Sequence, residues 1–173
     1  MTVASVEEPA ADRNALFRRV ARRFASGVTI VTTRLDGYVY GVTVSAFSTV
    51  SIEPLLVMVS VNGYSPILPM VERSKTFAVS ILRREQRDVS MYFATGGRAL
   101  DLTEFPGIAT TDAATGAPVI ADCLGYFDCH LHESVPGGDH RILIGAVAAT
   151  GHADGDPLVY YDGDYRSIDQ EYT

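Results

Sequence analysis

The sequence of 173 residues contains no tryptophan, a single lysine, two cysteines and no long hydrophobic run. Cys123 and Cys129 lie in one predicted strand and would be roughly 20 Å apart along it, so they cannot form a disulfide with each other. Two thiols without a metal-binding spacing are typical of a reducing compartment. No apolar segment approaches the roughly 20 residues that a membrane-spanning helix requires. The first eleven residues lack the segments of a secretory signal, so we predict a cytoplasmic protein.

Several sequence motifs of common enzymes are also missing. The chain has no Rossmann glycine fingerprint, P-loop, G-x-S-x-G elbow, C-x-x-C pair or H-E-x-x-H helix, which excludes common hydrolase and thiol-redox chemistry. A formal net charge of −7 argues against a nucleic-acid partner. His130 and His132 would share one strand face about 6.6 Å apart, but two imidazoles without a third ligand do not make a metal site. We therefore predict no bound metal.

One cluster of positive charge is present near the start of the chain. A helix is predicted from about Arg13 to Ser26, with Asp12 as its N-cap and Gly27 just past its end. Its apolar residues follow helical spacing, so we expect it to cover one face of a sheet. The basic side chains either form a solvated helix face or supply one contact to an anionic cofactor; they are Arg18, Arg19, Arg22 and Arg23.

Short strands are predicted along most of the chain. The segments 28–34 and 38–44 are joined by an Asp-Gly pair, which predicts an antiparallel hairpin. The segment 55–61 is apolar at nearly every position, so a strand there should be buried on both faces. In 123–133 the alternation sets one core face against a wet face that carries Asp128. Further strands are expected at 76–82, 108–111, 140–150 and 158–161, and helices at 65–73, capped by Ser65, and 84–94.

These elements indicate the fold class and the domain boundaries. Six to seven strands joined by tight turns, with two or three helices, favour an antiparallel barrel that carries helices over a doubly wound sheet. We expect one domain at 12–168, between a disordered tail at 1–11 and a C-terminal tail at 169–173.

Two segments are candidates for ligand contacts. Between Val42 and Ser51 five Ser or Thr hydroxyls occur among β-prone residues, which suits a flat, hydrogen-bonding heterocycle. His140 follows Gly137-Gly138-Asp139, where glycines allow a close approach of the backbone to a ligand. His140 begins a predicted strand and could face a cleft, although a simple turn residue is an equal reading.

Four segments, in order along the chain, resemble the short-chain flavin reductases, the small reductase components of two-component flavin-dependent monooxygenases. Gly138-Asp139-His140, followed by an apolar strand, is the most specific of the four. Together the resemblance runs from about residue 14 to residue 168, and the segments are 24–33, 41–51, 138–145 and 156–161.

The resemblance implies a mainly β fold with helices, a split β-barrel that forms a homodimer and binds FMN or FAD. It implies NADH or NADPH as the hydride donor, and an oxygenase or halogenase that receives the reduced flavin. By the same resemblance, 43–46 line the isoalloxazine, 60–65 hold the ribityl and phosphate groups, His140 orients the nicotinamide nucleotide, and Tyr165 helps to close that site. The implied cofactor-binding residues are Gly27, Val28, Gly41, Val42, Thr43, Val44, Ser45, Ala46, Ser60, Val61, Asn62, Ser65, His140 and Tyr165.

Two other functions stay open at this point. A split-barrel protein that retains its flavin for different redox chemistry or for sensing would have the same segments. A dimeric interaction module would use the wet strand face of His130 and His132 and bind no flavin. The choice between FMN and FAD is open as well. Arg141, beside His140, could favour the extra phosphate of NADPH, but one exposed arginine is weak support and we favour NADH.

Overall fold

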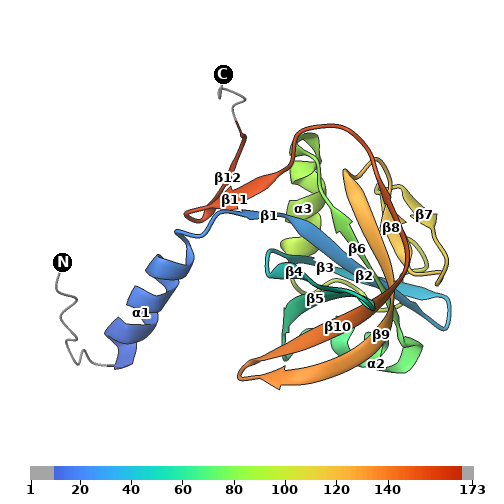
Figure 1. Cartoon of the computed structure of the whole chain (residues 1–173), viewed down its shortest axis with the longest axis horizontal. Helices are drawn as coiled ribbons and strands as arrows, with labels where there is room; N and C mark the ends of the chain where they lie inside the picture. Colours follow the sequence, from blue (N-terminus) through green and yellow to red (C-terminus); the bar gives the residue numbers. More distant parts are fainter. Residues whose placement is uncertain (1–9, 169–173) are drawn as a thin grey trace.

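The computed structural model describes residues 10–168, which fold into a mainly β structure with three α-helices (Figure 1). Seven strands form one sheet in the order β3-β2-β6-β9-β10-β5-β4, and every neighbouring pair is antiparallel. These strands are β2 (Thr29–Leu35), β3 (Tyr38–Val44), β4 (Phe47–Ile52), β5 (Leu55–Asn62), β6 (Thr76–Ile81), β9 (Gly125–Gly137) and β10 (His140–His152).

Five shorter strands and the helices complete the described part of the chain. Three strands pair in the order β1-β11-β12, and β7 pairs with β8. Their bounds are β1 (Ser26–Gly27), β7 (Thr110–Asp112), β8 (Pro118–Ile120), β11 (Val159–Tyr161) and β12 (Asp164–Arg166). The helices are α1 (Ala10–Ala21), α2 (Ile67–Ser74) and α3 (Arg87–Ala94), with a 3-10 turn η1 (Arg84–Gln86) before α3. No helix among residues 10–168 is long and apolar enough to cross a membrane.

The hairpin between β2 and β3 confirms its sequence prediction. Leu35 pairs with Tyr38, and the two residues between them have positive φ angles of 52° at Asp36 and 87° at Gly37. A two-residue turn with both φ angles positive matches the right-handed twist of the strands, which is why Asp-Gly is a strong signal for it. Local turn chemistry alone therefore determines this pairing.

The main core lies between the sheet and α2. Val57, Val59 and Val61 of β5 are buried there with Phe77 of β6 and Leu143 of β10. The alternate residues of β5 are half-buried, so the prediction that this strand is buried on both faces is wrong. Helix α2 packs against the valine cluster on one face only, and the other face of β5 is left partly open.

Helix α1 does not cover the sheet, which corrects the prediction for this segment. Figure 1 shows it standing apart from the sheet, and the residues from Asp12 to Ala25 are all exposed. It ends at Ala21, five residues before the expected end, because Ser26 and Gly27 pair with β11 as strand β1. Asp12 lies inside the first turn of the helix and is not its cap.

Strands β1, β4, β8 and β12 are absent from the sequence-based prediction. β4 is a serine-rich strand at the edge of the sheet, and most of its residues are exposed, so it lacks the apolar alternation that marks a strand. β8 has three residues and is too short for such a pattern. Predicted tail residues 1–9 and 169–173 lie outside the described part of the chain.

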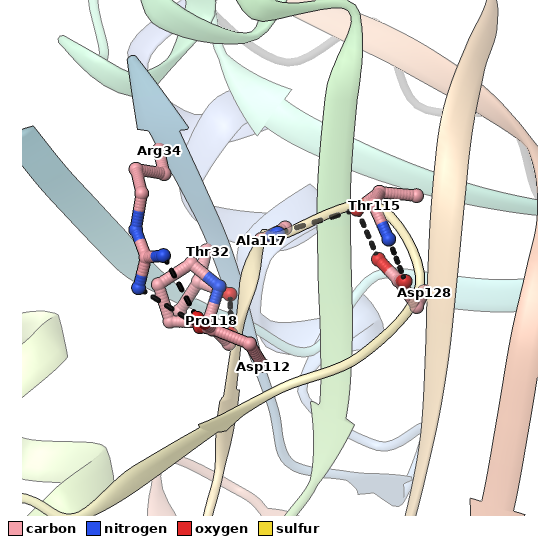
Figure 2. A network of polar contacts seen from close by, with 7 residues as sticks. All are labelled: Thr32, Arg34, Asp112, Thr115, Ala117, Pro118 and Asp128. Atoms are coloured by element: carbon pink, nitrogen blue, oxygen red, sulfur yellow. Dashed lines mark hydrogen bonds and ion pairs between the residues drawn. The ribbon is translucent and has the colours of Figure 1, made fainter. Parts of the chain in front are cut away.

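Strand β9 buries Asp128, which the alternation had assigned to the wet face. Its carboxylate accepts hydrogen bonds from the backbone N–H of Thr115, at 2.7 Å, and from the Thr115 hydroxyl (Figure 2). An ion pair of 2.9 Å between Arg34 and Asp112 is a second connection between the β7–β8 hairpin and the sheet. Loop residues thus cover Asp128, and only the tertiary fold brings them there.

Candidate functional site

A cavity of about 1180 Å³ lies where the ends of β3 and β5 meet the start of β10 and the loop after α3. One face of α1 forms a further wall. Asn14, Phe17, Arg18 and Ala21 line the cavity, and their spacing of three, four and seven residues places them on the same side of the helix. Segments that are far apart in the sequence therefore share one cavity.

The end of β3 forms the wall that connects to β5. The Thr43 hydroxyl donates a hydrogen bond of 2.6 Å to the carbonyl of Ser90 on α3, which holds this strand end against the helix. The backbone N–H of Ser60 donates to the carbonyl of Ala46 at 2.9 Å. This bond joins the two segments that the sequence had proposed separately for the flavin ring and for its phosphate.

A tight turn after β5 connects that strand to the tip of the β9–β10 hairpin. Gly63 donates its backbone N–H to the carbonyl of Asp139 at 2.9 Å, and a Cβ at residue 63 would lie 3.0 Å from that oxygen. Asn62 and His140 are paired residues of β5 and β10. The strand register thus places His140 beside the last residue of β5, at the start of the turn that leads to α2.

The Ser65 hydroxyl does not cap α2, contrary to the prediction. Pro66 is the N-cap residue, it makes no side-chain capping bond, and the Ser65 carbonyl accepts the Leu68 N–H at 3.1 Å. Within residues 10–168 the Ser65 hydroxyl has no hydrogen-bond partner, and the same holds for the hydroxyls of Ser45 and Ser60. Three serines that line the cavity can therefore donate to a ligand or accept from it.

His140 is held by its neighbour Asp139. The Asp139 Oδ1 lies 2.8 Å from His140 Nδ1, and this hydrogen bond lowers the pKa of the Asp139 carboxyl, with smaller contributions from the charges of His140 and Arg18. An ionised carboxylate at this distance favours a proton on Nδ1. The Nε2 atom of the partly exposed imidazole is then available to a ligand in the cavity.

A family model described as "Flavin reductase like domain" matches residues 21–169. An NADH-dependent flavin reductase of Rhodococcus sp is 36% identical over 155 residues, which cover 88% of this chain and 85% of the relative. The reductase component of 4-hydroxyphenylacetate 3-monooxygenase from Thermus thermophilus is 39% identical over 153 residues, which cover 88% and 95%.

The chain belongs to the flavin reductase-like family. A solved structure agrees: BorF, the flavin reductase component of a bacterial two-component tryptophan halogenase, matches with a TM-score of 0.82 and 32% identity. That match covers 90% of this chain and 98% of BorF. This flavin reductase is an oxidoreductase, and the resemblance read from its four sequence segments is confirmed.

Ten of the fourteen residues predicted to bind cofactors line the cavity of this flavin reductase. Val28 does not, since it is buried in the core, and Gly27 pairs with Val159 in the smaller sheet. Tyr165 shares a hydrogen bond of 2.8 Å with the Ser90 hydroxyl, lies under the Arg87 guanidinium, and is not among the lining residues. Gly41 is buried and does not line the cavity. The lining residues are Val42, Thr43, Val44, Ser45, Ala46, Ser60, Val61, Asn62, Ser65 and His140.

Two arginines that were not among the fourteen predicted residues also line the cavity. Arg18 is the member of the basic cluster on α1 that lines the cavity, whereas Arg23 pairs with Asp162 at 3.2 Å. Arg98, in the loop after α3, was not identified from the sequence. Its one local signal was the preceding Gly96-Gly97 pair, which had been interpreted only as the end of a helix.

The residues that line the cavity fit a flavin nucleotide. The serine hydroxyls can hydrogen-bond the polar edge of a heterocycle. The lining contains two arginines and one carboxylate, that of Asp139, which is bonded to His140. This local excess of positive charge occurs in a chain whose net charge is −7. Such a cavity attracts an anionic ligand more strongly than the rest of the surface does.

Proposed function

We propose that this flavin reductase oxidises NADH, reduces FAD or FMN, and releases the reduced flavin to a partner oxygenase or halogenase. The observation that carries the proposal is that the end of β3 and the histidine His140 line the same cavity. The β3 end that resembles the isoalloxazine segment lies on one side, and His140 lies beside the turn after β5. A cavity with both walls can hold two ligands against each other.

The chain's own contribution to the reaction is binding and orientation. The flavin, when bound, accepts a hydride from the nicotinamide ring, and this transfer needs the two rings in contact more than it needs an acid or a base. The 43–46 segment and its neighbouring hydroxyls would hold the flavin. His140, fixed by Asp139 through Nδ1, would orient the nicotinamide nucleotide through Nε2.

The contacts of Arg141 support NADH as the donor. Its guanidinium bonds to Glu72 Oε1 at 3.1 Å and to the Ser134 hydroxyl at 2.9 Å. An arginine that already pairs with a carboxylate is a poor partner for the extra phosphate of NADPH. Arg18 has no ion-pair partner within the described residues and faces the cavity from α1, so we assign it to a phosphate of one of the nucleotides.

We also propose that the protein is a split-barrel homodimer in the cytoplasm. α1 exposes 63% of Val20, Phe24 just past the end of this helix is 80% exposed, and the edge strand β4 exposes 88% of Ile52. Apolar side chains on an isolated helix and an unpaired strand edge are typical of surfaces that a second copy covers. The two thiols are free, in line with a reducing compartment.

Sedimentation equilibrium tests the dimer. Val20→Asp should shift the protein to monomers, because the charge would be desolvated in the interface, while Arg19→Asp on the same helix is the control for charge alone. A wild-type protein that is monomeric at micromolar concentration would contradict the proposal.

Anaerobic bleaching of free FAD and FMN tests the activity, with NADH or NADPH and catalytic amounts of protein. We expect rapid bleaching with NADH, and a raised KM for NADH in His140→Ala with a smaller change in kcat. His152→Ala changes an exposed histidine outside this cavity and serves as the control. Flavin retained through purification without NADH oxidation would instead favour a flavin-retaining role.

A further inference from the structure

Arg98 is a cation of the cavity wall whose charge no carboxylate within residues 10–168 balances. The guanidinium carbon lies 5.2 Å from the ring centre of Tyr40, 5.4 Å from that of Tyr92 and 5.5 Å from that of Phe93. Aromatic faces attract a cation but do not neutralise it. The residue is half-buried, so water screens its charge less than that of a surface arginine.

The hydrogen bonds of Arg98 fix the position of this charge. The guanidinium donates to the carbonyls of Tyr92, at 2.8 Å, and Thr95, and also to the carbonyl of Gly41 on β3. The first two bonds terminate α3. The third reaches across to the residue that directly precedes 42–46, the strand end that lines the cavity. Arg98 therefore belongs to the same wall as the segment proposed to contact the flavin ring.

Gly41 shows how closely this wall is packed. A Cβ at residue 41 would lie 2.7 Å from Phe93 Cε1, one of the three rings that surround the guanidinium. The charge is thus held between three rings and three carbonyls and has little freedom to move away from the cavity. A fixed charge of this kind can act on a ligand without a cost of reorganisation.

We propose that Arg98 favours the reduced, anionic state of the flavin over the oxidised, neutral ring, and so tunes the reduction potential of bound flavin. The inference rests on the proposed function. Transfer of a hydride, which is two electrons and one proton, from the nicotinamide to the flavin N5 leaves the flavin ring with one negative charge and the nicotinamide with one positive charge. A fixed cation beside the ring lowers the free energy of that product.

A structural role alone predicts a different result. Because Arg98 bonds to the last carbonyls of α3, it could serve only to end the helix. In that case its loss would lower stability and weaken both flavin states equally. A contact to the flavin phosphate would also weaken both states equally, but it would leave riboflavin, which has no phosphate, unaffected.

The test compares Arg98→Gln, which keeps hydrogen-bond donors without charge, with Arg98→Lys, which keeps the charge. Dissociation constants are measured anaerobically for oxidised and reduced FMN and for both states of riboflavin. We expect Arg98→Gln to weaken reduced FMN about tenfold more than oxidised FMN, a shift of about −30 mV in the potential of the bound two-electron couple. Riboflavin should show the same change, and Arg98→Lys should keep the wild-type ratio.

Controls keep the result interpretable. Arg34→Gln removes a half-buried arginine that pairs with Asp112 away from the cavity, and it should leave the ratio unchanged. Arg98→Met keeps the apolar stem against the rings and replaces Arg98→Gln if thermal melting shows that the latter is unfolded. An unchanged ratio in the folded uncharged variant would overturn the inference, as would a loss confined to FMN. Failure of the wild-type protein to bind flavin at all would overturn the proposed function with it.

Discussion

The central sheet and helix α1 carry apolar side chains at equally regular spacing, but they bury them to very different extents. In the sheet Phe77 of β6 is fully buried in the main core, whereas 74% of Phe17 on α1 is exposed. Figure 1 shows α1 apart from the sheet. The apolar side chains of the sheet are buried against one another and against α2, because the seven strands and this helix share one core. The chain just past the helix makes polar contacts to Asp162, and the apolar side chains of α1 stay exposed within the described residues.

The largest expected effect comes from one phenylalanine in each region. Phe77→Ala should lower the free energy of unfolding by about 3–5 kcal/mol, because it leaves a cavity in a packed core. Phe17→Ala should change it by less than about 0.5 kcal/mol in dilute protein. Urea unfolding followed by circular dichroism measures both. Equal losses in the two variants at a concentration where the protein is monomeric would show that α1 packs on its own chain.

A second comparison concerns polar contacts that hold the β7–β8 hairpin to the sheet. Asp128→Ala should cost about 1–3 kcal/mol in unfolding free energy, since it removes a buried carboxylate that accepts the N–H of the half-buried Thr115. Asp112→Ala breaks the more exposed pair with Arg34 and should cost at most about 1 kcal/mol. The same urea titration distinguishes the two, and a larger loss for Asp112→Ala would reverse this assignment of the two contacts.

The buried thiol of the sheet should make stability depend on pH. Burial raises the pKa of Cys129 from its ordinary value of 9.0 to about 12, with a smaller contribution from the charge of Asp128. Between these values the unfolded chain loses the thiol proton and the folded chain keeps it, so stability should fall as the pH rises from about 9 to about 12. Cys129→Ala should show a shallower decline in urea unfolding across this range, and an identical decline would contradict the shift.

The smallest effect is expected at the hairpin tip. Asp139→Asn should raise the KM for NADH about fivefold with little change in kcat, because it removes the carboxylate that fixes the His140 ring. The Asp139 carboxyl, whose pKa is lowered, is fully ionised between pH 6 and 8, so its own titration should not change the effect in this range. Steady-state kinetics at several pH values measure it. A fall in kcat alone would mean that Asp139 acts in the chemical step.

Some residues of the candidate site could be predicted from the sequence, and others depend on contacts between segments that are far apart in the chain. The segment 42–46 and His140 were identified from a family resemblance, and they do line one cavity. The same holds for Ser60, Val61, Asn62 and Ser65. Tyr165 was identified by the same route but lies against α3. The resemblance records residue types in order along the chain, whereas the place of a side chain depends on what packs around it. Arg98 was missed for this reason, since its partners Gly41 and Tyr92 lie on other elements.

The sequence by itself determined the elements whose signals are local. The β2–β3 hairpin follows from a two-residue turn, β3 has its predicted bounds, and the order of four segments identifies the family. The tertiary structure alone decided which residues are buried and which meet. It covered Asp128 with Thr115, left α1 without an apolar partner among residues 10–168, and gathered three rings around Arg98. Burial, and the register of strands that no tight turn joins, are set by contacts between distant segments, and no local pattern encodes them.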